Sequence, residues 1–564
     1  MNTISESSSA TAQLCLGSPR FTEASLAALA KTQGTASAWA SAFERDGVAS
    51  PLQAAGDFAV AIRDAAGRVF LAVDRFAIRT LCYRQDGNTL RFAERADALA
   101  DASTAIDPQA IFDYLFFHNI PSPRTIFKDI YRVPPGHYVL CENGKVTVAP
   151  YWIPTFNENH RESFESFRGT FLDILGEAVK TQTEGYQHQQ IGCFLSGGTD
   201  SSTVAGLINK VSGQRTASYS IGFDAQGYDE MEYARIAARH FNTEHHEYYV
   251  TPADLVQGIP EVAGSYDQPF GNSSALPAFY CAKVAKADGV DKMLAGDGGD
   301  ELFGGNTRYA KQRVFGWYDN IPKLVRKGFL EPVLALPGMD HIPLIKKGVS
   351  YVEQARVPLP DRTEMYNLLL RLGPEKVLTA DFLNRVDQSD PLRMQQETWR
   401  AAKADSQINR MLAFDWRYTL AENDLPKVCG TTKLANVEVG FPFLDDRLLE
   451  FSLGLPPDYK LKGLKLRWFF KEALRGFLPD AIITKKKHGF GLPFGVWVCT
   501  DQALRRLAED TLASLSQRNI VEPAFLRSLV SDLLPAHPGY YGELVWILMM
   551  LEQWLQQHAP TFRA

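Results

Sequence analysis

The chain has 564 residues, of which 45% are hydrophobic, so it exceeds one ordinary domain and two domains are the natural expectation. Its formal net charge of −6, with no long basic run, argues against a nucleic-acid-binding surface, which needs clustered Lys and Arg. The seven cysteines form no CxxC pair, which favours reduced thiols over zinc ligands or a disulfide framework.

Neither end of the chain carries a membrane or secretion signal in its pattern. Residues 1–10 are polar and rich in Ser, without the basic and then apolar regions of a signal peptide. The most apolar late run, residues 544–550, is much shorter than the roughly 20 residues that a membrane span requires. We therefore expect a cytoplasmic protein.

Strand patterns dominate the first part of the chain and alternate with helices in the second. The expected strands of the first part lie at residues 58–62, 68–73, 81–83 and 90–92. A helical pattern follows at 107–118, and the polar residues 155–163 predict a linker. Strands and helices then alternate to about residue 300, which predicts a doubly wound parallel sheet, and helical spacing dominates the remainder.

Residues 194–202 combine the end of an apolar strand, two adjacent glycines and the start of a helix. Glycine lets the backbone approach a phosphate closely, and a helix start directs N–H groups and a positive dipole end at an anion. Asp200 would repel phosphate directly, so it is expected to hold a Mg²⁺ that bridges to the phosphates. The alternative is an ordinary Gly-Gly turn, and no Walker lysine is present.

A second acidic, Gly-rich segment follows another apolar strand end at residues 293–305. In an open α/β sheet, ligands bind beyond the carboxyl ends of the strands, so the two segments can face one nucleotide. Asp300 is then placed to share the metal with Asp200. The alternative is that the two segments are unrelated turns.

These residues resemble the asparagine synthetase superfamily of ATP-pyrophosphatases. The signatures are Ser-Gly-Gly-x-Asp-Ser at 196–201 and Gly-x-Gly-x-Asp-Glu-Leu-Phe-Gly-Gly at 296–305. The likeness covers roughly residues 55–155 and nearly all of 160–500, including the segments at 221–223, 228–234, 245–247, 267–277, 438–445 and 487–493. It implies an α/β fold in which residues 156–564 form the synthetase domain and residues 1–155 form an α+β, Ntn-like amidotransferase remnant.

The amino-terminal part departs most from this family. Glutamine-hydrolysing members begin Met-Cys-Gly, with the cysteine as nucleophile, whereas this sequence begins Met1-Asn2-Thr3. Cys15 has neither a neighbouring base nor an N-terminal amine to activate it. The expected interpretation is a domain without glutaminase activity, as in lasso-peptide cyclases and β-lactam synthetases.

The resemblance implies ATP and Mg²⁺ as cofactors and a reaction in two steps. A carboxylate attacks the α-phosphorus to give an acyl-adenylate and pyrophosphate, and ammonia or an amine then displaces AMP. The implied nucleotide-binding residues are Leu195, Ser196, Gly197, Gly198, Asp200, Ser201, Ser202, Ile221, Gly222 and Gly296. The implied metal ligands are Asp200 and Asp300.

Two residues are expected to act on the reacting groups. Lys487 matches the family lysine that reaches the phosphate, although Lys485 and Lys486 leave open a solvated basic loop. Asp297 stands where asparagine synthetases have Glu and β-lactam synthetases have Tyr, and it could accept a proton from the incoming amine. The alternative for Asp297 is a turn residue.

Three functions remain open at this stage. They are an amide synthetase that uses ammonia, a ligase or macrolactam-forming cyclase that uses a substrate amine, and a non-catalytic nucleotide-binding paralogue. Residues 428–433 and Gly440 differ from the residues that members of the family more often have at these positions. Because these stretches approach the substrate pocket in the family, aspartate itself is a doubtful substrate. The expected substrates are a small-molecule or peptide carboxylate and ammonia or an amine, and a separate protein could supply the ammonia or a precursor. Binding to nucleic acid or to a membrane is not expected. A homodimer stays open.

Overall fold

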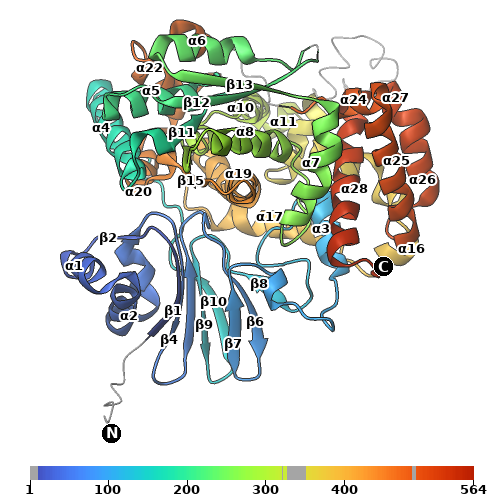
Figure 1. Ribbon diagram of the computed structural model, residues 1–564, viewed down its shortest axis with the longest axis horizontal. Helices are drawn as coiled ribbons and strands as arrows, with labels where there is room; N and C mark the ends of the chain where they lie inside the picture. Colours follow the sequence, from blue (N-terminus) through green and yellow to red (C-terminus); the bar gives the residue numbers. More distant parts are fainter. Residues whose placement is uncertain (1–10, 226, 320–321, 327–350, 486–490) are drawn as a thin grey trace.

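The computed structural model describes residues 11–225, 227–319, 322–326, 351–485 and 491–564. A smaller β-rich part, formed by the first 150 or so residues, lies against a larger α/β part (Figure 1). Helices from the end of the chain, including α24, α25 and α28, gather at one side of the larger part (Figure 1). The expected α/β fold class is confirmed.

The β-rich part is built on a five-stranded antiparallel sheet. In spatial order its strands are β1 (Thr11–Gly17), β4 (Phe58–Arg63), β5 (Val69–Val73), β9 (His137–Glu142) and β10 (Lys145–Pro150). The strands expected at 58–62 and 68–73 are confirmed as β4 and β5, which pair as an antiparallel hairpin with Ala59 opposite Val73. Strand β1, which pairs with β4, was not predicted from the sequence.

Side chains alternate between the two faces of this sheet, as the twofold repeat of a strand requires. One face packs under α1 (Ala24–Gln33) and α2 (Thr35–Asp46), with Trp39 fully buried against Phe58. The other face packs on a three-stranded sheet, whose spatial order is β7 (Thr89–Ala93), β6 (Cys82–Asp86) and β8 (Ile130–Arg132). Two short strands, β2 (Arg20–Phe21) and β3 (Ala54–Ala55), form a separate pair.

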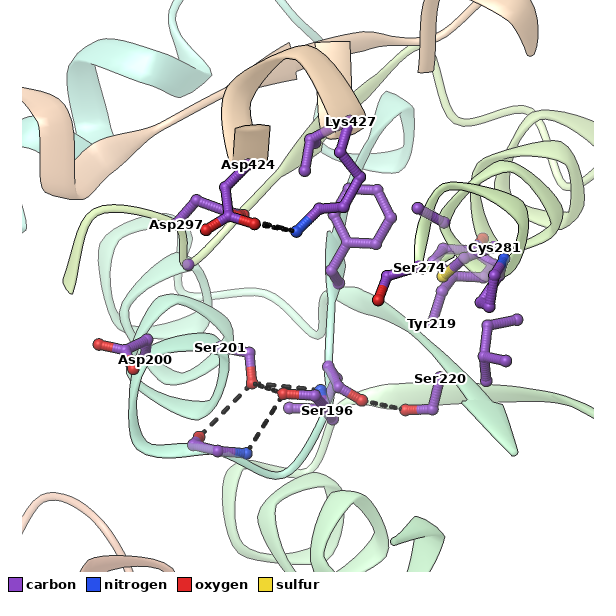
Figure 2. A pocket seen from close by; sticks show the side chains of 18 of the residues that line it. Ser196, Asp200, Ser201, Tyr219, Ser220, Ser274, Cys281, Asp297, Asp424 and Lys427 are labelled. Carbon is purple, nitrogen blue, oxygen red and sulfur yellow. Dashed lines mark hydrogen bonds and ion pairs between the residues drawn. The ribbon is translucent and has the colours of Figure 1, made fainter. Parts of the chain in front are cut away.

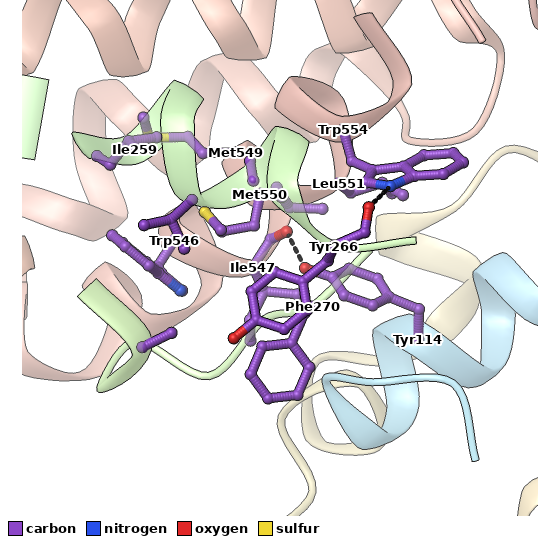
Figure 3. Packing of buried hydrophobic residues seen from close by; sticks show 14 of the residues in the cluster. Tyr114, Ile259, Tyr266, Phe270, Trp546, Ile547, Met549, Met550, Leu551 and Trp554 are labelled. Carbon is purple, nitrogen blue, oxygen red and sulfur yellow. Dashed lines mark hydrogen bonds between the residues drawn. The ribbon is translucent and has the colours of Figure 1, made fainter. Parts of the chain in front are cut away.

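Helix α3 (Pro108–Phe117) leaves this sandwich and enters the core of the larger part. Asp107 caps its start, accepting a hydrogen bond from the backbone N–H of Gln109 at 3.0 Å. Tyr114 is buried against α28 (Pro538–His558) and donates a hydrogen bond to the carbonyl of Ile547 at 2.8 Å (Figure 3). The sandwich and the larger part therefore share a hydrophobic core at this point.

The larger part contains a parallel sheet of five strands. Their spatial order is β13 (Glu244–Val250), β12 (Ala217–Phe223), β11 (Ile191–Phe194), β14 (Lys292–Leu294) and β15 (Glu438–Gly440). From β11 the chain adds strands to one side as far as β13 and then returns to the other side with β14. The order thus reverses between β11 and β14, which is where an open α/β sheet binds its ligand.

Helices cover both faces of this sheet. Ile191 and Leu195 pack with α4 (Phe164–Thr183), α5 (Thr199–Ser212) and α6 (Met231–Phe241). Tyr219 and Phe223 pack in a second cluster with α7 (Pro252–Ser265), α8 (Ala275–Ala287) and α28. These apolar strands are buried on both sides, as in other parallel sheets.

The remaining described chain is mainly helical, as predicted. Its helices before β15 are α9 (Gly299–Phe303), α10 (Thr307–Asp319), α11 (Lys323–Val325), α14 (Leu368–Leu372), α15 (Pro374–Val377), α16 (Ala380–Leu383), α17 (Asp390–Ala401), α18 (Gln407–Asp415), the π-helical η7 (Trp416–Asp424) and α19 (Leu425–Leu434). After β15 come α20 (Asp446–Gly454), α21 (Pro457–Lys460), the hairpin of β16 (Leu461–Lys462) and β17 (Lys465–Leu466), α22 (Trp468–Ala473), α23 (Asp480–Thr484), α24 (Phe494–Thr500), α25 (Gln502–Leu515), α26 (Pro523–Ser528), α27 (Leu534–Ala536) and α28. Within the described residues, no helix combines the length and apolar character needed to cross a membrane.

A buried ion pair ties the last helices together. Arg518 follows α25 and donates to both carboxylate oxygens of Glu552 on α28, at 2.5 and 3.1 Å. The guanidinium also donates to the carbonyls of Ala559 and Phe562. Both side chains of the ion pair are almost completely buried, so neither charge has water as a substitute partner.

We expect Glu552→Ala to destabilise the protein by about 3–5 kcal/mol, because it leaves a guanidinium buried without its counter-charge. The measurement is urea unfolding followed by tryptophan fluorescence. The matched control is Glu509→Ala, which removes an exposed partner of Arg505 and should cost under about 1 kcal/mol. Equal shifts for the two variants would contradict the assignment.

Candidate functional site

The first element of the site is the loop between β11 and α5. Ser196 and Ser201 hold it closed, since the Ser201 hydroxyl accepts from the Ser196 backbone N–H at 3.1 Å and lies 3.0 Å from the Ser196 hydroxyl. Gly198 occupies the cap position of α5, and no described side chain caps this helix. The first N–H groups of a 14-residue helix therefore remain available to an anion.

The second element is the loop between β14 and α9, which approaches the first loop closely. A Cβ on Gly296 would lie 2.8 Å from the backbone nitrogen of Ser201, and one on Gly305 would lie 1.7 Å from Oδ1 of Asp300. Both separations are shorter than nonbonded contacts allow. Glycine at these two positions is therefore what lets the two loops meet.

Arg467 joins the two loops. Its Nη1 donates to Asp200 Oδ2 and to Asp300 Oδ1, each at 2.6 Å, and its Nη2 donates to the other oxygen of Asp200. The guanidinium lies 4.0 Å from the centre of the Phe470 ring and the residue is only 5% exposed. The structure thus brings Asp200 and Asp300 to one buried cation.

A cavity of about 430 Å³ opens between these loops and α8 (Figure 2). The predicted nucleotide-binding residues that line it are Leu195, Ser196, Gly198, Asp200, Ser201, Ile221 and Gly296, and Asp300 lines it as well. Ser220 donates to the carbonyl of Leu195 and fixes the end of β11. Strands β11 and β12 and the two loops therefore supply one continuous wall.

Three of the predicted nucleotide-binding residues lie behind this wall. A Cβ on Gly197 would contact the backbone of α6, 2.4 Å from Ala234 N, and Gly222 lies against the ring of Tyr249. Ser202 is fully buried on α5. They support the loop by packing. Lys487 falls outside the described residues.

An acidic group with one lysine lies across the cavity from the loop between β11 and α5, which we call the serine loop because Ser196 and Ser201 hold it closed (Figure 2). Lys427 lies 2.9 Å from Asp424 and 3.7 Å from Asp297. Burial raises the pKa of Asp297 to about 6, although the Lys427 ammonium opposes the shift. The nearby carboxylates raise the pKa of Lys427, so its ammonium is retained at neutral pH even though it is buried.

Sequence reasoning missed four charged residues of this cavity or its border: Arg467, Lys427, Asp424 and Glu301. Burial and the neighbouring Asp300 raise the pKa of Glu301 well above its usual value. Asp424 and Lys427 are spaced three apart at the start of α19, a local signal that could have marked them. In the described ranges, no three His, Cys, Asp or Glu side chains come together as a metal site.

Two acidic, Gly-rich loops at the switch point of a parallel sheet define a nucleotide-binding α/β protein. A profile described as "Asparagine synthase" matches residues 170–556, and one described as "Glutamine amidotransferase domain" matches residues 25–152. The chain belongs to the asparagine synthase family, a family of ATP-dependent amide ligases. The expected family is confirmed.

Similar proteins match over most of the chain at modest identity. "Asparagine synthetase [glutamine-hydrolyzing] 1" of Bacillus subtilis is 24% identical over 493 residues, which cover 86% of this chain and 74% of that protein. A "Putative asparagine synthetase [glutamine-hydrolyzing]" of Mycobacterium tuberculosis is 23% identical, with coverage of 88% and 76%. "Amidase chry2" of Gibberella zeae is 24% identical, with coverage of 78% and 70%.

Among solved structures, the NMN synthetase from Francisella tularensis aligns with 46% of this chain and 94% of its own. The sequence identity is 15% and the TM-score is 0.21, too low to bear on the fold.

We expect Gly305→Ala to weaken MgATP binding at least about tenfold, because the new methyl group would displace Asp300 and, with it, Arg467. Isothermal titration calorimetry measures the affinity. Gly169→Ala is the control, since its Cβ on α4 would meet no atom within 4 Å. An unchanged affinity in a folded Gly305→Ala protein would contradict the role of this close approach.

Proposed function

We propose that this protein activates a carboxylate with ATP and joins it to ammonia or an amine, without hydrolysing glutamine itself. The observation that carries the proposal is the meeting of Asp200 and Asp300 beside the serine loop, opposite Asp297 and Lys427. One end of the cavity suits a polyphosphate and the other suits a proton transfer. An adenylating amide ligase needs both.

The serine loop and the start of α5 are suited to the pyrophosphate end of ATP. The Ser196 and Ser201 hydroxyls and the first N–H groups of α5, which has no side-chain cap, can donate hydrogen bonds to the phosphates, and Gly198 places no Cβ in the way. Ile221 lines the same cavity on β12, at a position suited to the adenine. The leaving pyrophosphate gains its stabilisation from these fixed dipoles.

Asp200 and Asp300 fit Mg²⁺, because this ion is usually held by one or two carboxylates together with substrate phosphates and water. When bound, the metal would neutralise charge on the phosphates. Arg467 keeps the two carboxylates close together despite their mutual repulsion. The arginine therefore preorganises the acidic pair for a cation.

Asp297 is suited to act as the proton acceptor for the amine. With a pKa of about 6 it is mostly ionised at neutral pH and remains basic enough to take a proton from nitrogen as the new bond forms. The Lys427 ammonium beside it stabilises the carboxylate. A glutamate at this position, as in asparagine synthetases, would extend one methylene further. The aspartate of this chain therefore holds its carboxylate, the proton acceptor, closer to the backbone.

The absence of glutaminase activity is supported by the surroundings of Cys15. This residue lies within β1, opposite Val60, and packs against the core under α1 and α2. Burial raises the pKa of its thiol, and no described residue hydrogen-bonds to it. A thiol in such a place is a poor nucleophile, so ammonia or an amine must arrive by another route.

A macrolactam-forming cyclase remains the second candidate, because it also adenylates a carboxylate and uses no glutamine. A third, non-catalytic role would not need Asp297 and Lys427 to be held 3.7 Å apart in the cavity that faces the serine loop. The retained geometry therefore favours an enzyme.

We expect ATP-dependent pyrophosphate release from a carboxylate panel with Mg²⁺, and hydroxamate formation when hydroxylamine traps the acyl-adenylate. Asp200→Ala should lower the rate at least about a hundredfold, because it removes charge stabilisation of the leaving group. Asp510→Ala, an exposed change on α25, is the control. Product analysis with ammonia, glutamine and amines separates the two candidate reactions, and nucleotide binding without pyrophosphate release would refute both.

We expect the amide-forming step to speed up as pH rises through about 6, because Asp297 must lose its proton to accept one from the amine. Asp297→Asn should slow this step by roughly 10²-fold or more and remove that limb of the pH profile. Single-turnover measurements between pH 5 and pH 8 test this expectation. A profile that keeps its limb in the Asn variant would assign the proton to another group.

A further inference from the structure

A second cavity, of about 470 Å³, adjoins the nucleotide cavity. Its walls come from the end of α3, the segment before α14, helices α17 and α18, the π-helical η7 and the start of α28. None of its lining residues belongs to the signature loops of the first cavity. We call it the lateral chamber.

Two buried amide oxygens in the wall of the lateral chamber have no hydrogen-bond partner. They belong to Asn119 and Gln395, which are 4% and 2% exposed. The Asn119 amide nitrogen donates to the Phe117 carbonyl at 3.2 Å, and that of Gln395 donates to the Glu364 carboxylate at 2.9 Å. Exchanging the nitrogen and the oxygen of either amide would place its oxygen against the oxygen that now accepts from its nitrogen, which is the Phe117 carbonyl or the Glu364 carboxylate. The present orientations are therefore favoured, and both amide oxygens stay unpaired.

Unpaired buried acceptors indicate that a donor is missing. Leaving such a group unsatisfied costs roughly 1–3 kcal/mol, and buried polar groups are normally paired for that reason. Both oxygens are covered by neighbouring atoms, so an N–H donor in the chamber would pair with one of them only by drawing the Asn119 or Gln395 side chain inward. The hydrogen bonding of the lateral chamber therefore favours an amine or amide over a carboxylate.

The charges of the chamber favour the same ligand. Glu364 and Glu543 line it, and burial raises the pKa of Glu543, so a cation beside this carboxyl group would favour its charged form. Its one lining arginine, Arg308, is already paired with Asp415 at 2.6 Å. His118 also lines the chamber, and burial lowers its pKa to about 4, which leaves it uncharged at neutral pH.

Two further cations lie near the chamber. Lys311 is 3.8 Å from the centre of the Tyr366 ring and Arg371 is 5.6 Å from that of Tyr540. Neither cation lines the chamber. The negative character of the lining is therefore set by the two glutamates.

A hydrogen bond joins a residue that lines the chamber to a residue that lines the nucleotide cavity. The Asn272 side chain, which lines the nucleotide cavity, donates to the Asn423 side chain, which lines the lateral chamber, at 3.1 Å. The next residue after Asn423 is Asp424, which faces Lys427 beside Asp297. The asparagine pair therefore marks a place where the linings of the two cavities meet, one residue away from the acidic group beside Asp297.

Aromatic side chains supply the rest of the wall. Phe117 stacks on Tyr418 with the ring centres 5.4 Å apart, and Phe414 packs on the same tyrosine at 4.9 Å. Phe116 and Tyr540 also line the chamber. These rings suit an apolar or aromatic body attached to the amino group.

We infer that the lateral chamber binds the amine partner of the ligation, a cationic primary amine with an apolar or aromatic body, and directs its nitrogen past Asn272 and Asn423 to Asp297. This inference rests on the proposed ligase function and names its second substrate class. The bound ammonium first gives one proton to solvent. The nitrogen then forms a bond to the acyl carbon as the bond from that carbon to the phosphate oxygen breaks, AMP leaves, and Asp297 takes the second proton.

Direct binding of benzylamine to the purified full-length protein tests the chamber, with benzoate as the ligand of similar shape and opposite charge. We expect benzylamine to bind and benzoate to bind at least tenfold more weakly. Glu543→Gln should weaken benzylamine binding about tenfold or more without changing MgATP affinity. The matched control is Glu397→Gln, because Glu397 lies on the same helix as Gln395 and lines a separate cavity.

A second variant, Gln395→Met, removes one unpaired oxygen at similar side-chain volume and should also weaken benzylamine binding. Equal binding of benzylamine and benzoate, no binding of either, or equal effects of Glu543→Gln and Glu397→Gln would overturn the inference. Its failure is distinguishable from failure of the proposed function. Pyrophosphate release with hydroxylamine trapping would persist if only the chamber were wrong, whereas benzylamine binding would persist if only adenylation were wrong.

Discussion

The site depends on placing two carboxylates within reach of one buried guanidinium. Asp200 and Asp300 would repel each other if they were brought together alone, and Arg467 cancels that repulsion inside the protein. This arrangement imposes a steric requirement, because the two loops can approach each other only if positions 296 and 305 are glycines. Sheet order, loop composition and the turn that carries Arg467 all serve this one meeting point.

The sequence predicted the parts of the fold and site that local patterns specify. The acidic residues of both loops were found because glycines and a strand end mark them within a few positions. Arg467 was missed because it lies 167 residues from Asp300 along the chain and in a turn with φ of 54°, where no motif identifies it. Asn119 and Gln395 could not be found either, since an unpaired oxygen is a property of packing between distant segments.

The amino-terminal part is joined to the synthetase part by ion pairs and by apolar packing. Arg75 pairs with Asp446 and Arg20 with Asp445, at the start of α20. Helix α3 adds apolar side chains to the core around α28 and ends at the lateral chamber. The sandwich thus contributes to the shape of the lateral chamber through packing.

The π-helical segment η7 has a consequence for how this enzyme could change. Tyr418 and Asn423 of this segment line the lateral chamber, and its last residue, Asp424, lines the nucleotide cavity beside Lys427. Its first residue, Trp416, lines a third cavity next to the sandwich. Nine consecutive residues therefore border all three of these cavities. Substitutions confined to this stretch could redirect the choice of substrate and leave the grip on the nucleotide intact, so new specificities could arise by a short evolutionary path.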